Sequence, residues 1–183
     1  MQFSKIKRNA EKFLAPSLKG RVHIYSAVYR KYHDQPTRTW LTFDGQQILS
    51  ASDLQFERLE HRLYKEREAS LGERPDWSVL LHRFYTTPYY MASQKLYDTI
   101  DAELYAQGVF NSYAIQQALI RYNELSIAQA LSHDNPFVRG YALLDGRVGK
   151  RTLQKFESFD TLFEARCYTI RLRAEEDFHG KAS

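Results

Sequence analysis

The stretch RVHIYSAVYRKYHDQPTRTWLTFDGQQILS, residues 21–50, decides the fold class of this chain. Residues 21–32 alternate between polar and apolar side chains and are rich in β-branched and aromatic residues, a pattern that predicts a β-strand. Two more short strands are expected on either side of Asp44-Gly45, because this dipeptide suits a two-residue hairpin turn. The stretch therefore predicts a three-stranded antiparallel meander with Asp44 and Gly45 at the tip of its second hairpin.

The alternation along the first strand assigns its side chains to two faces of the sheet. One face is expected to carry Val22, Ile24, Ser26 and Val28. The other is expected to carry Arg21, His23, Tyr25, Ala27, Tyr29, Lys31 and His33. Across the hairpin, Leu41 is predicted to oppose Ile48. The second face then also carries Trp40, Thr42, Gln47 and Leu49.

This second face groups aromatic, histidine and lysine side chains. Such a surface resembles in chemistry the platforms on which proteins stack unpaired bases. Its candidate stacking residues are Tyr25, Tyr29 and Trp40. The alternative is that a helix of this helix-rich chain covers the face and buries the rings.

Helices are predicted on both sides of the meander. Residues 3–14 place apolar side chains at helical spacing, with Ser4 as the expected N-cap. Ser52 is predicted to cap the next helix, with Gln55 completing a capping box. After the connection at residues 71–76, the pattern is helical nearly to the end of the chain. These further helices are expected over residues 76–85, 89–108, 111–131, 136–153 and 160–178.

The predicted fold class is therefore α+β, an N-terminal helix plus a three-stranded antiparallel meander packed on a helical C-terminal two-thirds. Residues 1–183 are expected to form a single domain, since 43% of the residues are hydrophobic and no low-complexity tract or repeat interrupts the chain. Within it, residues 1–70 supply the helix, small sheet and helix, and residues 75–183 supply the helical part.

The single cysteine, Cys167, excludes an internal disulfide framework and indicates a reducing compartment. It shares a helical stripe with Phe163, Ile170 and Ala174, so we predict a buried, unreactive thiol. The N-terminus lacks the apolar run of a secretory signal, and no stretch approaches the roughly 18 apolar residues of a membrane span. We therefore expect a cytoplasmic protein with no membrane partner.

Charge is unevenly distributed along the chain, whose formal net charge is +4. Residues 1–50 have a net charge of +6, residues 51–135 of −4 and residues 136–183 of +2. The two basic ends are therefore the regions that could meet an acidic partner.

The segment HDNPFVRGYALLDGRVGKRTLQKF, residues 133–156, concentrates basic side chains. Its apolar stripe is expected to consist of Phe137, Tyr141, Leu144, Val148 and Thr152. This spacing predicts a helix from Pro136 that continues past Gly146 and Gly149 to about Leu153, at a cost of roughly 1 kcal/mol for each glycine. Such a helix would carry a basic ridge suited to phosphates. The alternative is a solvated face whose arginines pair with acids of the middle region.

The candidate polyanion-binding residues come from this ridge and from the first strand. They are Arg139, Arg147, Lys150, Arg151, Lys155, Arg21 and Lys31.

Catalytic and metal-binding patterns are not apparent. Asp98, Asp101 and Glu103 are better explained as a solvated helix face than as metal ligands. His82 and His133 each lack a second histidine four residues on, the spacing of a helical zinc site. We therefore expect no catalytic residue, no metal and no cofactor.

Two resemblances accompany these patterns. The segment NPFVRGYALLDGRVG, residues 135–149, resembles the second helix of a HEAT repeat, but only one such unit is present where a solenoid needs about three. Together with residues 3–34, the segment NPFVRGYALLDGRVGKRTL resembles an uncharacterised family of small bacterial cytosolic proteins. This resemblance implies a bacterial, cytosolic protein and no particular activity.

The expected function is non-catalytic: a cytosolic binding or regulatory protein that contacts a polyanion or an acidic partner through basic and aromatic surfaces. The expected partner is nucleic acid or an acidic protein, and oligomerisation stays open. Two alternatives are a small enzyme with a site of dispersed Tyr, His and Arg residues, and a self-associating scaffold.

Overall fold

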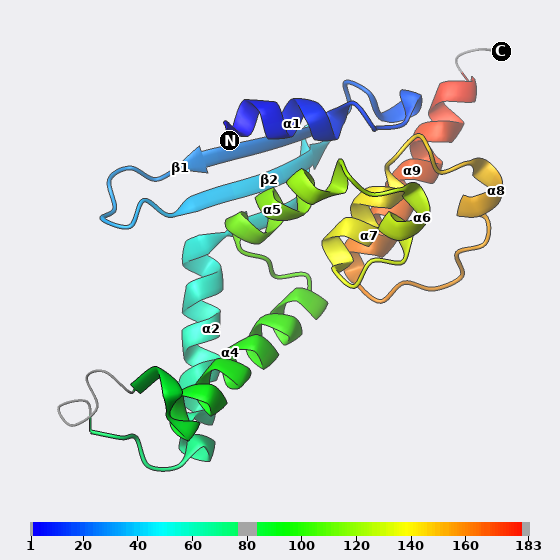
Figure 1. The fold of residues 1–183 in the computed structure, drawn as a ribbon. Helices are drawn as coiled ribbons and strands as arrows, with labels where there is room; N and C mark the ends of the chain where they lie inside the picture. The colour runs from blue at the N-terminus through cyan, green and yellow to red at the C-terminus, as the bar shows by residue number, and fades with distance from the viewer. Residues whose placement is uncertain (1, 77–83, 181–183) are drawn as a thin grey trace.

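The computed structural model describes residues 2–76 and 84–180 (Figure 1). The helix predicted at residues 76–85 falls mostly on residues 77–83, which lie outside the described residues. The first half contains α1 (Phe3–Glu11), the 3₁₀ helix η1 (Pro16–Leu18), β1 (Val22–Val28), β2 (Thr37–Phe43), β3 (Gln46–Ser52), α2 (Asp53–Arg67) and η2 (Glu68–Leu71). The second half contains η3 (Phe84–Thr86), α4 (Pro88–Ala106), α5 (Ser112–Tyr122), α6 (Ile127–Leu131), α7 (Pro136–Leu143), α8 (Lys150–Leu153) and α9 (Leu162–Gly180).

The predicted α+β class and the antiparallel meander are confirmed. The strands follow the order β1-β2-β3, and both β1 and β3 are edge strands. Asp44 and Gly45 form the tip of the second hairpin with φ angles of 49° and 77°. Two successive positive φ angles define the turn that matches the twist of the strands, which is why this dipeptide predicted the hairpin correctly.

The predicted pairing of Leu41 with Ile48 is wrong. Leu41 pairs with Leu49, and the register shifts between Leu41 and Thr42. The extra residue, Ile48, forms a bulge, and Ile48 and Leu49 are both buried, at 7% and 6% exposure. A bulge breaks the strict alternation of a strand, so two consecutive apolar side chains can both leave solvent. Leu49 therefore lies on the inner face with Leu41, not on the outer face.

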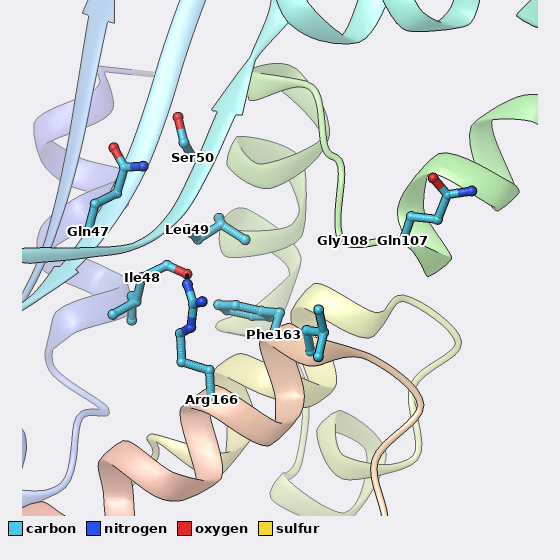
Figure 2. A pocket seen from close by; sticks show the side chains of 9 residues that line it. Gln47, Ile48, Leu49, Ser50, Gln107, Gly108, Phe163 and Arg166 are labelled. Atoms are coloured by element: carbon cyan, nitrogen blue, oxygen red, sulfur yellow. Dashed lines mark hydrogen bonds between the residues drawn. The ribbon is translucent and has the colours of Figure 1, made fainter.

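Helices α1 and α5 lie behind the strands in Figure 2, on the inner face of the sheet. Ile24 and Leu41 from that face are completely buried in the main core. The core continues between α7 and α9, which approach closely at Gly140. A Cβ atom at this position would come within 2.6 Å of the Phe163 ring, so only glycine allows this packing. Cys167 is fully buried in the same core, as predicted.

Helices α2 and α4 pair in an arm that projects from this body (Figure 1). The arm has its own small core of Phe56, Tyr64, Ile100 and Leu104. Ser52 precedes the first residue of α2 as predicted, but the capping box with Gln55 does not form. The Asp53 carboxylate instead accepts backbone N–H bonds from Thr37 and Ser112, each at 2.8 Å, and so joins α2 to β2 and α5.

Several predicted helix boundaries are corrected. Helix α1 begins at Phe3 after Gln2, so Ser4 is not its N-cap. The single helix predicted over residues 111–131 is divided into α5 and α6, because Ser126 and Gln129 form a capping box that starts a new helix.

The predicted unbroken helix from Pro136 to Leu153 is also wrong. Helix α7 ends at Leu143, and α8 begins only at Lys150. Between them the backbone crosses the chain that follows α1: Ala15 N–H donates to the Leu144 carbonyl at 3.0 Å, and Gly146 N–H donates to the Phe13 carbonyl at 2.8 Å. A Cβ atom at Gly146 would lie 3.2 Å from the Ala15 Cα, so the glycine allows the two chains to approach. Four residues of the predicted stripe are nevertheless buried, and Thr152 is exposed.

Candidate functional site

Two aromatic rings stand together on the outer face of the sheet. Tyr25 and Trp40 are directly opposite each other in the β1–β2 pairing, and their rings stack at a centroid distance of 5.3 Å with 19° between the planes. His23 lies beside Tyr25, at 6.1 Å between ring centroids. Tyr25 remains 39% exposed, so its ring is not buried beneath a helix.

A cation lies over each ring of this stack. The Lys7 Nζ is 4.8 Å from the centroid of Tyr25, and the Arg38 guanidinium carbon is 5.1 Å from the centroid of Trp40. Lys7 comes from α1, which lies along the free edge of β1, since the Glu11 carboxylate accepts the Ile24 N–H at 3.1 Å. Both distances are within the range of a cation–π contact.

Arg38 is fixed from the β3 side of the sheet. Its Nε donates to Ser50 Oγ at 3.0 Å, and a second guanidinium nitrogen donates to the Gln47 side-chain carbonyl. The order across the sheet is therefore Lys7, Tyr25, Trp40 and Arg38. Because neighbours on both sides contact the rings, the exposed features of this row are ring edges and cations.

A small hollow of about 200 Å³ continues this row beyond the β3 edge (Figure 2). Gln47 and Ser50, which hold Arg38, line it from β3, and Gln107 and Gly108 lie across from them. Arg166 from α9 reaches β3 itself, and its guanidinium donates to the Ile48 carbonyl at 2.8 Å. Arg166 thus supplies a hydrogen-bond donor to the carbonyl of Ile48, the bulged residue of the edge strand β3. It also places an exposed cation beside the sheet.

We refer to Lys7, Tyr25, Trp40, Arg38 and Arg166 as the cationic band. The strand residues of the outer face include no carboxylate. They are His23, Tyr25, Ala27, Arg38, Trp40, Thr42, Gln47, Ser50 and Ser52. Lys7 lies 3.6 Å from Glu11, whereas the contacts of Arg38 and Arg166 with the described residues are to neutral groups.

The remaining sheet candidates lie away from the band. Strand β1 ends at Val28, and the Tyr29 N–H donates to the Pro36 carbonyl at 2.9 Å in the connection to β2. Lys31 is exposed in that same connection. Arg21, at the other end of β1, binds Asp44 and Asp177 at 2.6 and 2.9 Å. The hydrogen bonds to these two carboxylates raise the pKa of the Arg21 guanidinium, and the bond to Asp44 has the largest effect.

Arg139 is an internal link and not part of a ridge. Its guanidinium bonds Glu164 and Asp160, at 2.5 and 3.0 Å, and donates to the His133 and Asp134 carbonyls. The Glu164 side chain is only 5% exposed, so this pair fixes α7 to the start of α9. The two carboxylate partners, Asp160 and Glu164, belong to the C-terminal region and not to the acidic middle of the sequence.

Arg147 is likewise paired, with the fully buried carboxylate of Asp145 at 2.8 Å. Asp145 also accepts the Tyr122 hydroxyl at 2.7 Å and the Arg147 N–H at 2.7 Å. The hydrogen bond to Asp145 is the main cause of the raised pKa of Arg147, while burial and then Asp145 raise the pKa of Tyr122. The guanidinium also lies over the Phe13 ring, at 4.2 Å.

Three candidates in the basic segment remain exposed and form no ion pair with a described residue. They are Lys150, Arg151 and Lys155. They lie in and just after the short helix α8, at the opposite end of the molecule from the β1–β2 connection that carries Lys31 (Figure 1). The structure therefore does not bring all seven predicted cations into one surface.

Sequence reasoning missed all three cations of the band, Lys7, Arg38 and Arg166. Arg38 is two residues before Trp40, so strand alternation would have been enough to place it on the same face, but Arg38 was not among the predicted residues. Arg166 could not be found in this way, because its position depends on α9 packing beside β3.

The arm carries a separate electrostatic feature, a pair of facing carboxyl groups on α2 and α4. Burial, followed by the hydrogen bond with Asp101, raises the pKa of Glu60 to about 7. Burial also raises the pKa of Asp101. Glu103, the third acid considered as a metal ligand, instead bonds Arg67 at 2.8 Å.

Within residues 2–76 and 84–180, no three His, Cys, Asp or Glu side chains are grouped closely enough to hold a metal ion. No helix in those ranges has the length and apolar character needed to cross a bilayer.

Fold and surface together define the class of this protein: a small α+β protein with cations set against aromatic rings on an open sheet face. The chain belongs to the SF0329 protein family, whose model matches residues 2–174. This confirms the resemblance to an uncharacterised family. No curated protein and no solved structure matches the chain.

Proposed function

We propose that this protein is a non-catalytic binding protein that holds the sugar-phosphate backbone of single-stranded nucleic acid across the cationic band. The observation that carries the proposal is that Arg38 and Arg166 flank the same two polar side chains, Gln47 and Ser50, with no carboxylate among the outer-face residues. Guanidinium groups present paired donors that match phosphate oxygens.

Phosphate contact is favoured over base stacking by the positions of the rings. A base that stacks needs a free ring face. Tyr25 has Lys7 and Trp40 as neighbours, and Trp40 has Tyr25 and Arg38. A phosphate needs only the cations, so the band would bind with little dependence on base sequence.

A single strand is favoured over a duplex because the band lies on a sheet face. Open sheet faces and positively charged grooves are the usual supports for unpaired strands. The exposed cations Lys5 and Arg8 of α1, and Lys12 directly after it, lie on the segment that also supplies Lys7 and would extend the contact. With the bacterial and cytoplasmic expectation from sequence, this suggests a role in RNA or DNA handling in the cytoplasm.

The test is fluorescence anisotropy of labelled 20-nucleotide single strands with Arg38→Glu, Arg166→Glu and the double variant. We expect each single reversal to weaken binding about tenfold, because a removed phosphate contact is replaced by a repulsive one. Lys95→Glu is the matched control, since Lys95 is exposed on α4 away from the band, and its affinity should be unchanged.

Circular dichroism melting of each variant separates loss of binding from loss of fold. Equal effects of Lys95→Glu and Arg38→Glu would contradict the proposal. Competition by poly-glutamate as strong as that by a single strand would instead point to an acidic protein partner.

A further inference from the structure

A second surface, distinct from the cationic band, has the form of a ligand pocket. It is a hollow of about 540 Å³ between η1, the turn before α8, α8 itself and α9. Its volume is within the range of small-molecule sites and exceeds that of the hollow beside Arg166. Segments from three distant parts of the sequence form its walls.

The walls are mainly apolar, and glycine keeps one of them open. Pro16, Val148, Leu153 and Leu172 supply hydrocarbon surface. Gly149 has φ −76° and ψ 159°, a conformation open to any residue, and a Cβ atom there would meet nothing within 4 Å. A larger side chain at position 149 would therefore project into open space at the pocket without straining the backbone.

A buried arginine lies at this pocket. The Arg171 side chain is only 6% exposed, and it donates to the Asp145 carbonyl at 2.7 Å, the Val148 carbonyl at 3.2 Å and the Glu175 carboxylate at 2.8 Å. These bonds use three of the five guanidinium N–H groups. Arg171 is among the residues that line the hollow, and a buried donor gains most from a charged acceptor.

The charges at the pocket favour an anion at the α8 side. Glu175 already accepts bonds from Arg171 and from Ser17, at 2.8 and 2.9 Å. Lys150 is exposed and forms no ion pair with a described residue. Glu176 is exposed on α9 and would repel an anion placed against that wall.

We propose that this pocket binds a small amphipathic anion, with its apolar body against Val148, Leu153 and Leu172 and its carboxylate or phosphate near Lys150 and Arg171. The inference does not depend on the proposed function, because its test uses no nucleic acid.

The test titrates octanoate, octyl phosphate and octylamine into the ¹⁵N-labelled protein and follows amide chemical shifts. Octanoate or octyl phosphate should produce saturable shifts at Gly149, Lys150 and Leu172. The stronger of the two identifies the preferred anionic group. Octylamine, which has the same tail and the opposite charge, should bind at least tenfold more weakly.

Three variants locate the site. Gly149→Leu should abolish the saturable shifts by filling the pocket, and Lys150→Glu should weaken binding at least tenfold. Lys155→Glu is the control, because it makes the same charge change nearby without lining the pocket. The proposal is overturned if neither anion binds saturably, if octylamine binds equally well, or if Gly149→Leu leaves binding unchanged in a folded protein.

Discussion

At the scale of single residues, Asp145 has the largest structural role among the charged groups of the basic segment. Its carboxylate is fully buried and joins Tyr122 of α5 to Arg147 in the turn after α7, while its backbone carbonyl accepts a bond from Arg171 of α9. Through its side chain and its backbone carbonyl together, this one residue thus accepts hydrogen bonds from α5, from the turn after α7 and from α9. A buried carboxylate with these partners stabilises the arrangement mainly because removing it leaves the partners unsatisfied.

We predict that Asp145→Ala lowers the free energy of unfolding by about 2–4 kcal/mol, because the Tyr122 hydroxyl and the Arg147 N–H lose their acceptor. Asp160→Ala is the matched comparison: Asp160 also pairs with an arginine, but its side chain is 81% exposed. That variant should lose no more than about 1 kcal/mol. Urea denaturation measures both, and similar losses would show that Asp145 has no special role.

The same residues show why the basic ridge was mispredicted. Apolar spacing correctly identified Phe137, Tyr141, Leu144 and Val148 as buried. The spacing could not show that Asp145 and Gly146 meet the chain after α1, because that contact joins residues about 130 positions apart. Arg139 and Arg147 instead form ion pairs within the protein, as the alternative interpretation expected. Their carboxylate partners, however, are not in the acidic middle of the sequence.

At the scale of elements, the α2–α4 arm holds two carboxyl groups where two charges would repel. Two carboxyl groups can form a hydrogen bond only if one of them carries a proton. Burial, followed by this hydrogen bond with Asp101, raises the pKa of Glu60 to about 7. Glu57 and Asp98 add further negative charge nearby. We therefore expect the packing of these helices to depend on pH.

When the pKa of a group is higher in the folded protein than in the unfolded chain, the native protein keeps a proton that the unfolded chain releases at pH values between the two. The stabilisation from Glu60 should be complete below about pH 4.5 and should be lost as the pH rises through about 7. We predict that Glu60→Gln removes this loss and makes the protein more stable than the wild type at pH 8, by about 1 kcal/mol after allowance for solvent screening. Thermal melting of both proteins from pH 4.5 to pH 8 gives the comparison.

The wild type and Glu60→Gln should have nearly equal melting temperatures at pH 4.5. Parallel melting curves across the whole pH range would contradict the shared-proton account of the arm.

Element types were easier to predict than element lengths. The turn at Asp44-Gly45 and the position of α4 follow from local backbone preferences of Gly and Pro, which act over a few residues. The bulge at Ile48 and the division of residues 111–131 into α5 and α6 were missed. The bulge depends on what packs around β3, whereas the Ser126–Gln129 capping box was visible in the sequence and was overlooked.

At the scale of the whole molecule, the sheet has two different surfaces. Its inner face is buried against α1 and α5, which lie behind the strands in Figure 2, and its outer face carries the cationic band. The sequence correctly placed His23, Tyr25 and Trp40 together on that outer face. It could not show that Lys7 from α1 and Arg166 from α9 approach the sheet from its two edges.

The most direct test of the central claim is the salt dependence of single-strand binding by the wild type and by the Arg38→Gln/Arg166→Gln double variant. For single strands the slope of log K against log salt concentration is about −0.7 per phosphate contact. Loss of two cations of the band should therefore make the slope shallower by about 1.4. An unchanged slope, with binding retained, would show that the phosphates are held elsewhere and would contradict the proposal.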